Sequence, residues 1–256
     1  MTKVVPYKKD FDLVSVVEKI SNVILWSSVA VSIATIVIFY SGMEQTIANK
    51  LIVVLNTVIC FLSVSYFLSD IFSNYLFQLA EAKRRDDFFD NSLYTNHSEE
   101  NSNEYFTNDN ISPGIKKMGI NCFENSFFTK SVATAMLKPM VIKTVIVVLL
   151  FLFLALFTNN HLFTTALQIA LPFTIIQQTV RLFIFKNRVN GICKEFRQIF
   201  TTHNKKTIYK SILHNVTSYE ATLSWACIKL DSNLFNKMND ELSEKWNKIK
   251  AKCNIA

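Results

Sequence analysis

The chain has few of the residues that build common catalytic and phosphate-binding motifs. It holds only four glycines in 256 residues, and none of them belongs to a glycine-rich phosphate loop. Its five cysteines are scattered without a Cys-x-x-Cys pair, which indicates neither a metal cluster nor a disulfide framework. The four histidines never fall at ligand spacing, and no serine or cysteine lies in a strained-turn nucleophile motif. We therefore expect no enzyme activity, no catalytic residue, no metal and no cofactor.

Long apolar runs are what the chain has in abundance. They cover residues 23–40, 51–68, 141–157 and 162–185, each 17 to 24 residues long. A helix rises about 1.5 Å per residue, so roughly 20 residues cross a hydrocarbon core of about 30 Å. A soluble helix would show a polar residue at every third or fourth position, and residues 145–157 show none. The sequence therefore predicts an all-α integral membrane protein with four transmembrane helices.

The positive charges are sorted by side. With these four runs in a membrane, 26 of the 27 lysines and arginines fall on one side, and Lys50 alone falls on the other. The positive-inside rule makes the first side the cytosol, with both termini in it. The expected parts are a cytosolic N-terminal segment (1–22), a first transmembrane hairpin (23–73), a cytosolic insert (74–140), a second transmembrane hairpin (141–185) and a basic helical cytosolic C-terminal region (186–256).

Two of the four transmembrane helices are expected to extend into the cytosol. Helical spacing of apolar residues continues past Asp70 after the second run and past Lys186 after the fourth. The cytosolic part is expected to be helical as well. A helical hairpin is predicted for residues 115–138, and two more helices for about 206–230 and 240–253.

The segment 91–110 allows two interpretations. It is rich in Asn, Ser, Thr and Glu and has no periodic apolar pattern, which is typical of a solvated linker. It also carries Tyr94, Tyr105 and Phe106, which a linker has little reason to hold.

Two of the apolar runs carry a polar stripe. In the second, residues three or four positions apart lie on one face: Asn56, Cys60, Ser63, Phe67, Asp70 and Asn74. A charge at the centre of a span costs about 2.5 to 3.5 kcal/mol on insertion scales, so a stripe needs a reason. One is hydrogen bonding between helices, worth about 0.6 kcal/mol per bond. The other is a water-filled path at the axis of an oligomer, for which we predict the lining residues Asn56, Ser63, Asp70, Thr174, Gln178 and Arg181.

The C-terminal tail is the basic part of the chain. From Arg181 onward it holds fourteen basic and six acidic residues, whereas residues 81–140 are slightly acidic. Attraction to anionic lipid, at about 1 kcal/mol per basic residue, is one explanation. The other explanation is a site for a phosphorylated ligand, since the tail also holds aromatic side chains on which bases can stack, such as Tyr209, Tyr219 and Trp225.

Four sequence stretches carry a resemblance to a known family. They are KRRDDFFDNSLYTN, EYFTND and NCFENSFFT in the insert and SYEATLSWACIKLDSNLFNKMNDELSEKW in the tail. Together with the two apolar hairpins they resemble the SMODS-associated four-transmembrane family of pore-forming effectors, which accompany nucleotidyltransferases in antiphage systems of the CBASS type. The plan is also similar to that of Hailong-type membrane effectors, whose nucleotidyltransferase makes DNA oligomers.

This resemblance implies a homo-oligomeric channel, with a tetramer expected, in the inner membrane of a bacterium. Its cytosolic part would sense a cyclic nucleotide or a DNA or RNA oligonucleotide from a partner nucleotidyltransferase, and the open pore would depolarise the membrane during infection. The ligand-binding residues expected on this basis are Arg84, Arg85, Tyr94, Tyr105, Lys116, Lys117, Arg188, Arg197, Lys205 and Lys206. Two alternatives stay open: a small transporter or exporter subunit, and a membrane-anchored scaffold.

Overall fold

The computed structural model describes residues 5–100, 102, 108, 110–157, 162–202 and 207–255, and for residues 153–157 and 162–172 it describes the backbone alone. Within these residues all regular secondary structure is helical and no strand is present, as the all-α prediction requires. The helices are α1 (Lys8–Tyr40), α2 (Gln45–Leu93), α3 (Ile115–Phe157), α4 (Leu162–Thr202), α5 (Ile208–Ala226) and α6 (Ser232–Lys252).

Three of these helices are long and apolar enough to cross a membrane. They are α1, α2 and α3 up to Leu152. The fourth predicted span, residues 162–185, begins within α4, but the side chains of residues 162–172 lie outside the described part of the chain. By length and composition these three helices are compatible with the predicted membrane protein, and the fourth span stays a prediction.

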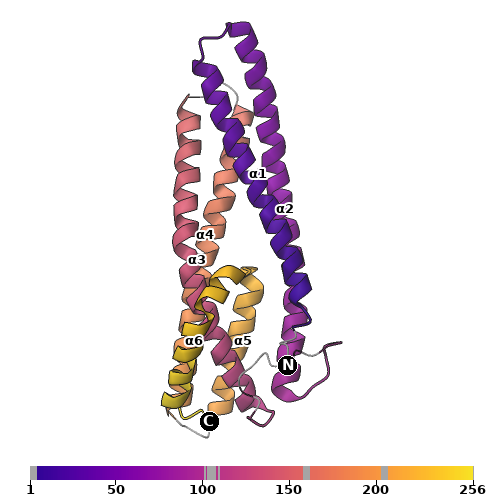
Figure 1. The fold of residues 1–256 in the computed structure, drawn as a ribbon, viewed down its shortest axis with the longest axis vertical. Helices are drawn as coiled ribbons and strands as arrows, with labels where there is room; N and C mark the ends of the chain where they lie inside the picture. The colour runs from indigo at the N-terminus through magenta and orange to yellow at the C-terminus, as the bar shows by residue number, and fades with distance from the viewer. Residues whose placement is uncertain are drawn as a thin grey trace. The chain divides into compact units, whose positions relative to one another are not determined.

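The chain divides into two compact units. We call Leu13–Tyr75 with Pro139–Val180 the four-helix unit, and Met1–Asp12, Leu76–Lys138 and Arg181–Ala256 the α5–α6 unit. In the four-helix unit, α1 and α2 form an antiparallel hairpin that packs against the corresponding parts of α3 and α4 (Figure 1). Helices α1, α2, α3 and α4 each contribute residues to both units.

The predicted continuity of two helices is confirmed, and a third proves continuous as well. Helix α2 runs for 49 residues and α4 for 41 without interruption. The helical hairpin predicted for residues 115–138 is wrong, because these residues belong to the single 43-residue helix α3, which includes Pro139. Ser131 and Thr134 hydrogen-bond to carbonyls four residues back at 2.8 and 2.7 Å, so their hydroxyls are satisfied without a turn.

The core of the α5–α6 unit is aromatic. Phe123 of α3 stacks on Phe196 of α4 and meets Trp246 of α6 edge to face, with ring centroids 5.8 and 5.0 Å apart. Helix α5 lies very close to α3, since a Cβ on Gly119 would stand 2.8 Å from Cγ2 of Ile212. A side chain at residue 119 would therefore push these two helices apart.

Helix α6 begins earlier than predicted. Its N-cap is Asp231, whose side chain accepts hydrogen bonds from the backbone N–H groups of Asn233 and Leu234 at 2.8 and 3.0 Å. The predicted start near residue 240 was eight residues late. The last turn carries Lys250 and Lys252, which favours the helix C-terminus electrostatically.

The segment after α2 is held by a carboxylate where it is described. Asp90 accepts hydrogen bonds from the backbone N–H groups of His97 and Ser98 and from the hydroxyl of Thr95. Gly114, which precedes α3, has φ +148° and donates its N–H to the carbonyl of Ser92 at 2.8 Å. Residues 94–98 are therefore tied to the end of α2 and do not form a simple solvated linker.

Candidate functional site: a polar ring in the four-helix unit

Side chains of α2 and α4 join in a hydrogen-bonded group. The amide nitrogen of Gln178 donates to Asp70 Oδ1 at 2.7 Å, and the Tyr66 hydroxyl donates to Gln178 Oε1 at 3.3 Å. Asn74, one turn further along α2, donates to the other oxygen of Asp70 at 3.3 Å. A carboxylate that accepts two amide donors is well satisfied in this setting.

Three further contacts extend this group to all four helices. The hydroxyls of Ser21 (α1) and Ser69 (α2) are 2.6 Å apart, and those of Thr144 (α3) and Thr179 (α4) are also 2.6 Å apart. Lys143 Nζ of α3 donates to Asn22 Oδ1 of α1 at 2.5 Å. We call these contacts, with Gln178–Asp70, the polar ring; its members are Ser21, Asn22, Ser69, Asp70, Lys143, Thr144, Gln178 and Thr179.

Each helix supplies two consecutive residues to the polar ring, and helix geometry explains why. Neighbouring residues of an α-helix with 3.6 residues per turn point about 100° apart. In a four-helix bundle the two adjacent helices lie in directions that differ by a similar angle. One residue of each pair therefore reaches one neighbour and the second residue reaches the other, which closes the ring.

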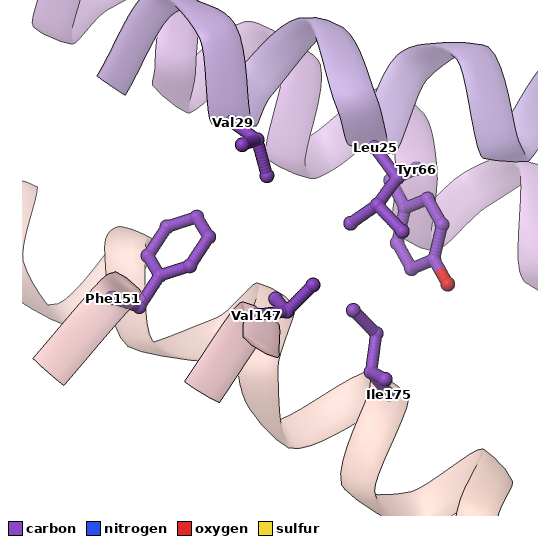
Figure 2. Close-up of a cluster of buried hydrophobic side chains, with 6 residues drawn as sticks. All are labelled: Leu25, Val29, Tyr66, Val147, Phe151 and Ile175. Atoms are coloured by element: carbon purple, nitrogen blue, oxygen red, sulfur yellow. The ribbon is translucent and has the colours of Figure 1, made fainter. Parts of the chain in front are cut away.

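An apolar cluster begins one helical turn from the polar ring. Leu25, Tyr66, Val147 and Ile175 each stand four residues from a ring member of the same helix and are at most 3% exposed. Val29 and Phe151 add a further turn, and Figure 2 shows the six side chains directed toward a common centre from α1, α2, α3 and α4. The middle of the bundle is thus filled by side chains at this level.

Two buried polar atoms on α2 lack partners. Asn56 Oδ1 and Ser63 Oγ are inaccessible to solvent and make no hydrogen bond within the described part of the chain. An unsatisfied buried polar group costs about 1 to 3 kcal/mol. The register of α1 against α2, set by Ser21–Ser69, places Ser28 and Thr35 at about the same levels, but their hydroxyls bond to carbonyls of their own helix.

The predicted pore-lining residues have different surroundings. Asn56, Ser63, Asp70 and Gln178 face the interior of the four-helix unit, and Thr174 is half-buried one turn before Gln178. Arg181 belongs to the α5–α6 unit. In the stripe on α2, Phe67 points outward and is 55% exposed, and Tyr66 takes its place on the inner face. The Asp70–Gln178 contact is the interhelical hydrogen bond that the first explanation of the stripes expects.

The predicted ligand-binding residues are spread over the α5–α6 unit. Lys116, Arg188 and Arg197 are exposed, Arg85 is half-buried, and Lys117 is buried. Tyr94 is 88% exposed with a left-handed backbone, φ 63°. Tyr105, Lys205 and Lys206 lie outside the described residues. An open hollow of about 380 Å³ between α4 and α5 is lined by other residues: Glu195, Gln198, Ile199, Lys210, Ser211 and His214.

Arg188 of α4 already has an aromatic partner. Its guanidinium lies 4.6 Å from the ring centroid of Trp225 on α5, and that ring is 46% exposed. A cation over an indole face at this distance is a cation–π contact. The pair offers a charged and an aromatic surface side by side.

Arg84 is engaged inside the α5–α6 unit. It forms ion pairs with Glu81 of its own helix, at 2.7 Å, and with Glu220 of α5. Burial raises the pKa of Glu220, and the charge of Arg84 opposes this rise. Glu220 Oε1 has no hydrogen-bond partner in the described residues. The single guanidinium of Arg84 is thus paired with two carboxylates. A phosphate at Arg84 would have to compete with both.

Sequence reasoning identified two of the eight members of the polar ring. The stripes on α2 and α4 pointed to Asp70 and Gln178, but no polar stripe was predicted on α1 or α3, which supply Ser21, Asn22, Lys143 and Thr144. Lys143, one of the basic residues counted on the cytosolic side, contacts Asn22. The available signal was that each of these residues has a polar neighbour in sequence.

Comparison of the chain with family models, with curated proteins and with solved structures finds no match. Among the described residues, no three His, Cys, Asp or Glu side chains are grouped as a metal site needs. The resemblance to pore-forming effectors therefore stays a prediction that rests on the quoted stretches.

Proposed function

We propose that the protein is a homo-oligomeric membrane pore, closed in the conformation described here, that a nucleotide or oligonucleotide signal opens. The proposal includes a bacterial inner membrane with both termini in the cytoplasm, as the charge asymmetry favours. The tetramer, the partner nucleotidyltransferase and the role in abortive infection come from the resemblance to antiphage effectors.

The observation that carries the proposal is the pair of unsatisfied polar atoms on α2. Asn56 Oδ1 and Ser63 Oγ lie on the same face as Asp70, at intervals of seven residues. Their burial without partners has a cost, and contact with water would remove it. A helix face of this kind is expected in a protein that has a second, hydrated state.

The apolar cluster supplies a reason for the closed state. Hydrophobic constrictions close channels because a narrow apolar passage does not hold water. Leu25, Val147 and Ile175 fill this level of the four-helix unit, and the polar ring next to them joins the helices. Opening then requires the ring contacts to break and the polar faces of α2 and α4 to meet water.

Ion flux from liposomes that contain the full chain tests the pore. Gln178→Leu removes the donor to Asp70, and Gln177→Leu is the matched control because Gln177 is the exposed neighbour. We expect the first variant to leak ions above the wild-type level and the second to behave as wild type. A bond of this kind in a membrane is worth about 0.6 and at most about 1.7 kcal/mol, so the leak should rise about 3- to 20-fold.

The probes for the signal are cyclic dinucleotides and short DNA and RNA oligomers, added to the same liposomes. A channel should respond to at least one of them, and binding should weaken as salt rises if phosphate contacts dominate. Absence of flux in every variant and with every probe would overturn the pore. Transport of a solute without ion flux would favour the transporter, and binding of anionic lipid alone would favour the scaffold.

A further inference from the structure

The exposed apolar surface of α1 and α2 is longer than a membrane is thick. Large apolar side chains are exposed from Leu13 to Tyr40 on α1 and from Ile47 to Tyr75 on α2. At about 1.5 Å per residue each stretch measures roughly 42 Å, against a hydrocarbon core of about 30 Å. A tilt of about 45° would be needed to bury either stretch in lipid, and observed tilts average about 20° and reach about 40°.

With the predicted spans, residues 23–40 and 51–68, in lipid, the excess falls at residues 13–20 of α1 and 71–75 of α2, on one side of the polar ring. Six side chains there are each 50 to 60% exposed: Leu13, Val16, Ile20, Ile71, Phe72 and Tyr75. We call them the α1–α2 strip. All belong to the four-helix unit, and the residues opposite them on α1, Val14 and Val17, are buried. The strip is therefore the outer face of a hairpin whose inner face is already packed.

The spacing of the exposed apolar residues on α1, from the strip onward, fits a helical partner. Leu13, Val16, Ile20 and Val23 follow one another at intervals of three, four and three residues, and each is at least 50% exposed. This is the a and d pattern of a left-handed helix–helix seam. Ala30 and Val37 follow Val23 at intervals of seven residues along α1 and are exposed as well.

We propose that the α1–α2 strip is the contact between copies of this chain, with the α1 helices parallel. Copies inserted in the same direction bring identical strips to the same level in the membrane. Each strip then covers the apolar surface of the neighbouring copy that extends beyond the hydrocarbon core. Any other partner would need an apolar face of the same length at the same level.

The area of the strip is in keeping with such a contact. Six half-exposed side chains of large residues, about 150 to 250 Å² for an aromatic, leave on the order of 500 Å² of apolar surface. Contiguous apolar patches larger than a few hundred Å² mark interaction sites. A stable interface uses about 800 Å² per partner, and the continuation of the seam along α1 supplies more.

Cysteine cross-linking of the full chain in liposomes tests this contact. The half-buried Cys60 and Cys227 are first replaced by alanine, while Cys122, Cys193 and Cys253 are buried and stay. Val16→Cys, in the α1–α2 strip, should form a covalent dimer on oxidation. The matched control is Leu149→Cys on α3, which is 60% exposed in the same unit and should stay monomeric.

A second pair of variants measures the association itself. Leu13→Gln with Ile20→Gln should lower the oligomer mass found by light scattering in detergent, whereas Leu213→Gln on α5, at 44% exposure, should not. Equal cross-linking at both cysteines, or none at Val16→Cys with an unchanged mass, would overturn the contact. Labelling of Val16→Cys by a lipid-soluble maleimide alone, without a cross-link, would assign the strip to lipid and also overturn it.

This inference rests on the homo-oligomer of the proposed function but not on conduction. Cross-linking without any ion flux would leave the contact in place and remove the pore. Flux without cross-linking would leave the pore and remove this contact.

Discussion

The two units join their helices by different polar contacts. In the four-helix unit these contacts are the hydrogen bonds of the polar ring, such as Gln178–Asp70 at 2.7 Å, while the buried hydroxyls of Ser28 and Ser32 bond to carbonyls of their own helix at 2.8 and 2.7 Å. In the α5–α6 unit, Arg84 of α2 is paired with Glu220 of α5 across two helices. A hydroxyl bonded to its own helix ties that helix to no neighbour, whereas a buried ion pair joins two helices.

This difference predicts which unit rearranges its helices more readily. The four contacts of the polar ring are worth about 0.6 kcal/mol each by the average for membrane helices. Breaking one buried ion pair by removing a partner costs about 3 to 5 kcal/mol. On this comparison we expect the polar contacts of the four-helix unit to break more readily than the buried ion pairs of the α5–α6 unit.

The largest expected effect comes from breaking the ion pairs of the α5–α6 unit. Arg84→Met leaves Glu81 and Glu220 buried without a positive charge and should lower the free energy of unfolding by about 3 to 5 kcal/mol. Denaturant unfolding in detergent, followed by circular dichroism, measures it. Lys83→Met is the control, because its pair with Asp10 is exposed and worth about 0 to 1 kcal/mol. Equal losses of unfolding free energy in Arg84→Met and Lys83→Met would contradict the difference expected between buried and exposed ion pairs.

Asp90 should give the next largest effect, confined to one loop. Burial alone would raise its pKa, but hydrogen bonds from Ser98, His97 and Thr95 lower it from 3.8 to about 2. Its stabilising effect is therefore complete above about pH 4 and is lost as the pH falls toward 2. Asp90→Asn removes the charge at neutral pH.

Hydrogen exchange of the His97 and Ser98 amides measures this change. Hydrogen bonds to a charged group are worth about 1.5 to 3 kcal/mol, so exchange should accelerate at least about tenfold in Asp90→Asn. Asp86→Asn, at an exposed position on the same helix, should leave it unchanged. Unchanged exchange in both variants would show that the carboxylate does not hold the loop.

Two glycines of the α5–α6 unit should respond to alanine substitution with opposite changes in stability. Gly119→Ala would place a Cβ 2.8 Å from Ile212 and should destabilise by about 1 to 3 kcal/mol through overpacking. Gly191→Ala meets open space in the middle of α4 and should stabilise by about 0.4 to 1 kcal/mol. Thermal unfolding should give opposite signs, and a stabilising Gly119→Ala would refute the close approach of α3 and α5.

The smallest effect is expected for a single contact of the polar ring. Thr144→Val removes the hydroxyl that meets Thr179 and should weaken helix packing by about 0.6 kcal/mol. Thr57→Val is the control, since that exposed hydroxyl bonds only to the carbonyl of Val53. A loss of several kcal/mol in denaturant titration would mean that the four-helix unit is as rigid as the α5–α6 unit.

Periodicity was enough to predict the long helices, including the continuity of α2 and α4. It failed for residues 115–138, where the apolar residues were interpreted as a helical hairpin. No glycine or proline lies between Gly119 and Pro139, and that absence was the better signal for one helix. The start of α6 could also have been read from Asp231, a good N-cap followed by a helical pattern.

The candidate site was only partly accessible to the same reasoning. Spacing identified the faces of α2 and α4 that hold Asp70 and Gln178. It did not identify which helix stands beside which, and the contacts Ser21–Ser69 and Thr144–Thr179 depend on that arrangement. Ion pairs such as Arg84–Glu220 depend on tertiary packing in the same way.

The most direct test of a bundle that opens to water is the reactivity of a thiol at residue 63. Ser63→Cys is introduced into a chain with Cys60 and Cys227 replaced by alanine, and a water-soluble methanethiosulfonate is added to liposomes. If the bundle opens to water, modification should be slow when Gln178 is present and about 3- to 20-fold faster, together with ion flux, in Gln178→Leu. No modification in either background would show that this helix face stays dry, and the proposed pore would be contradicted.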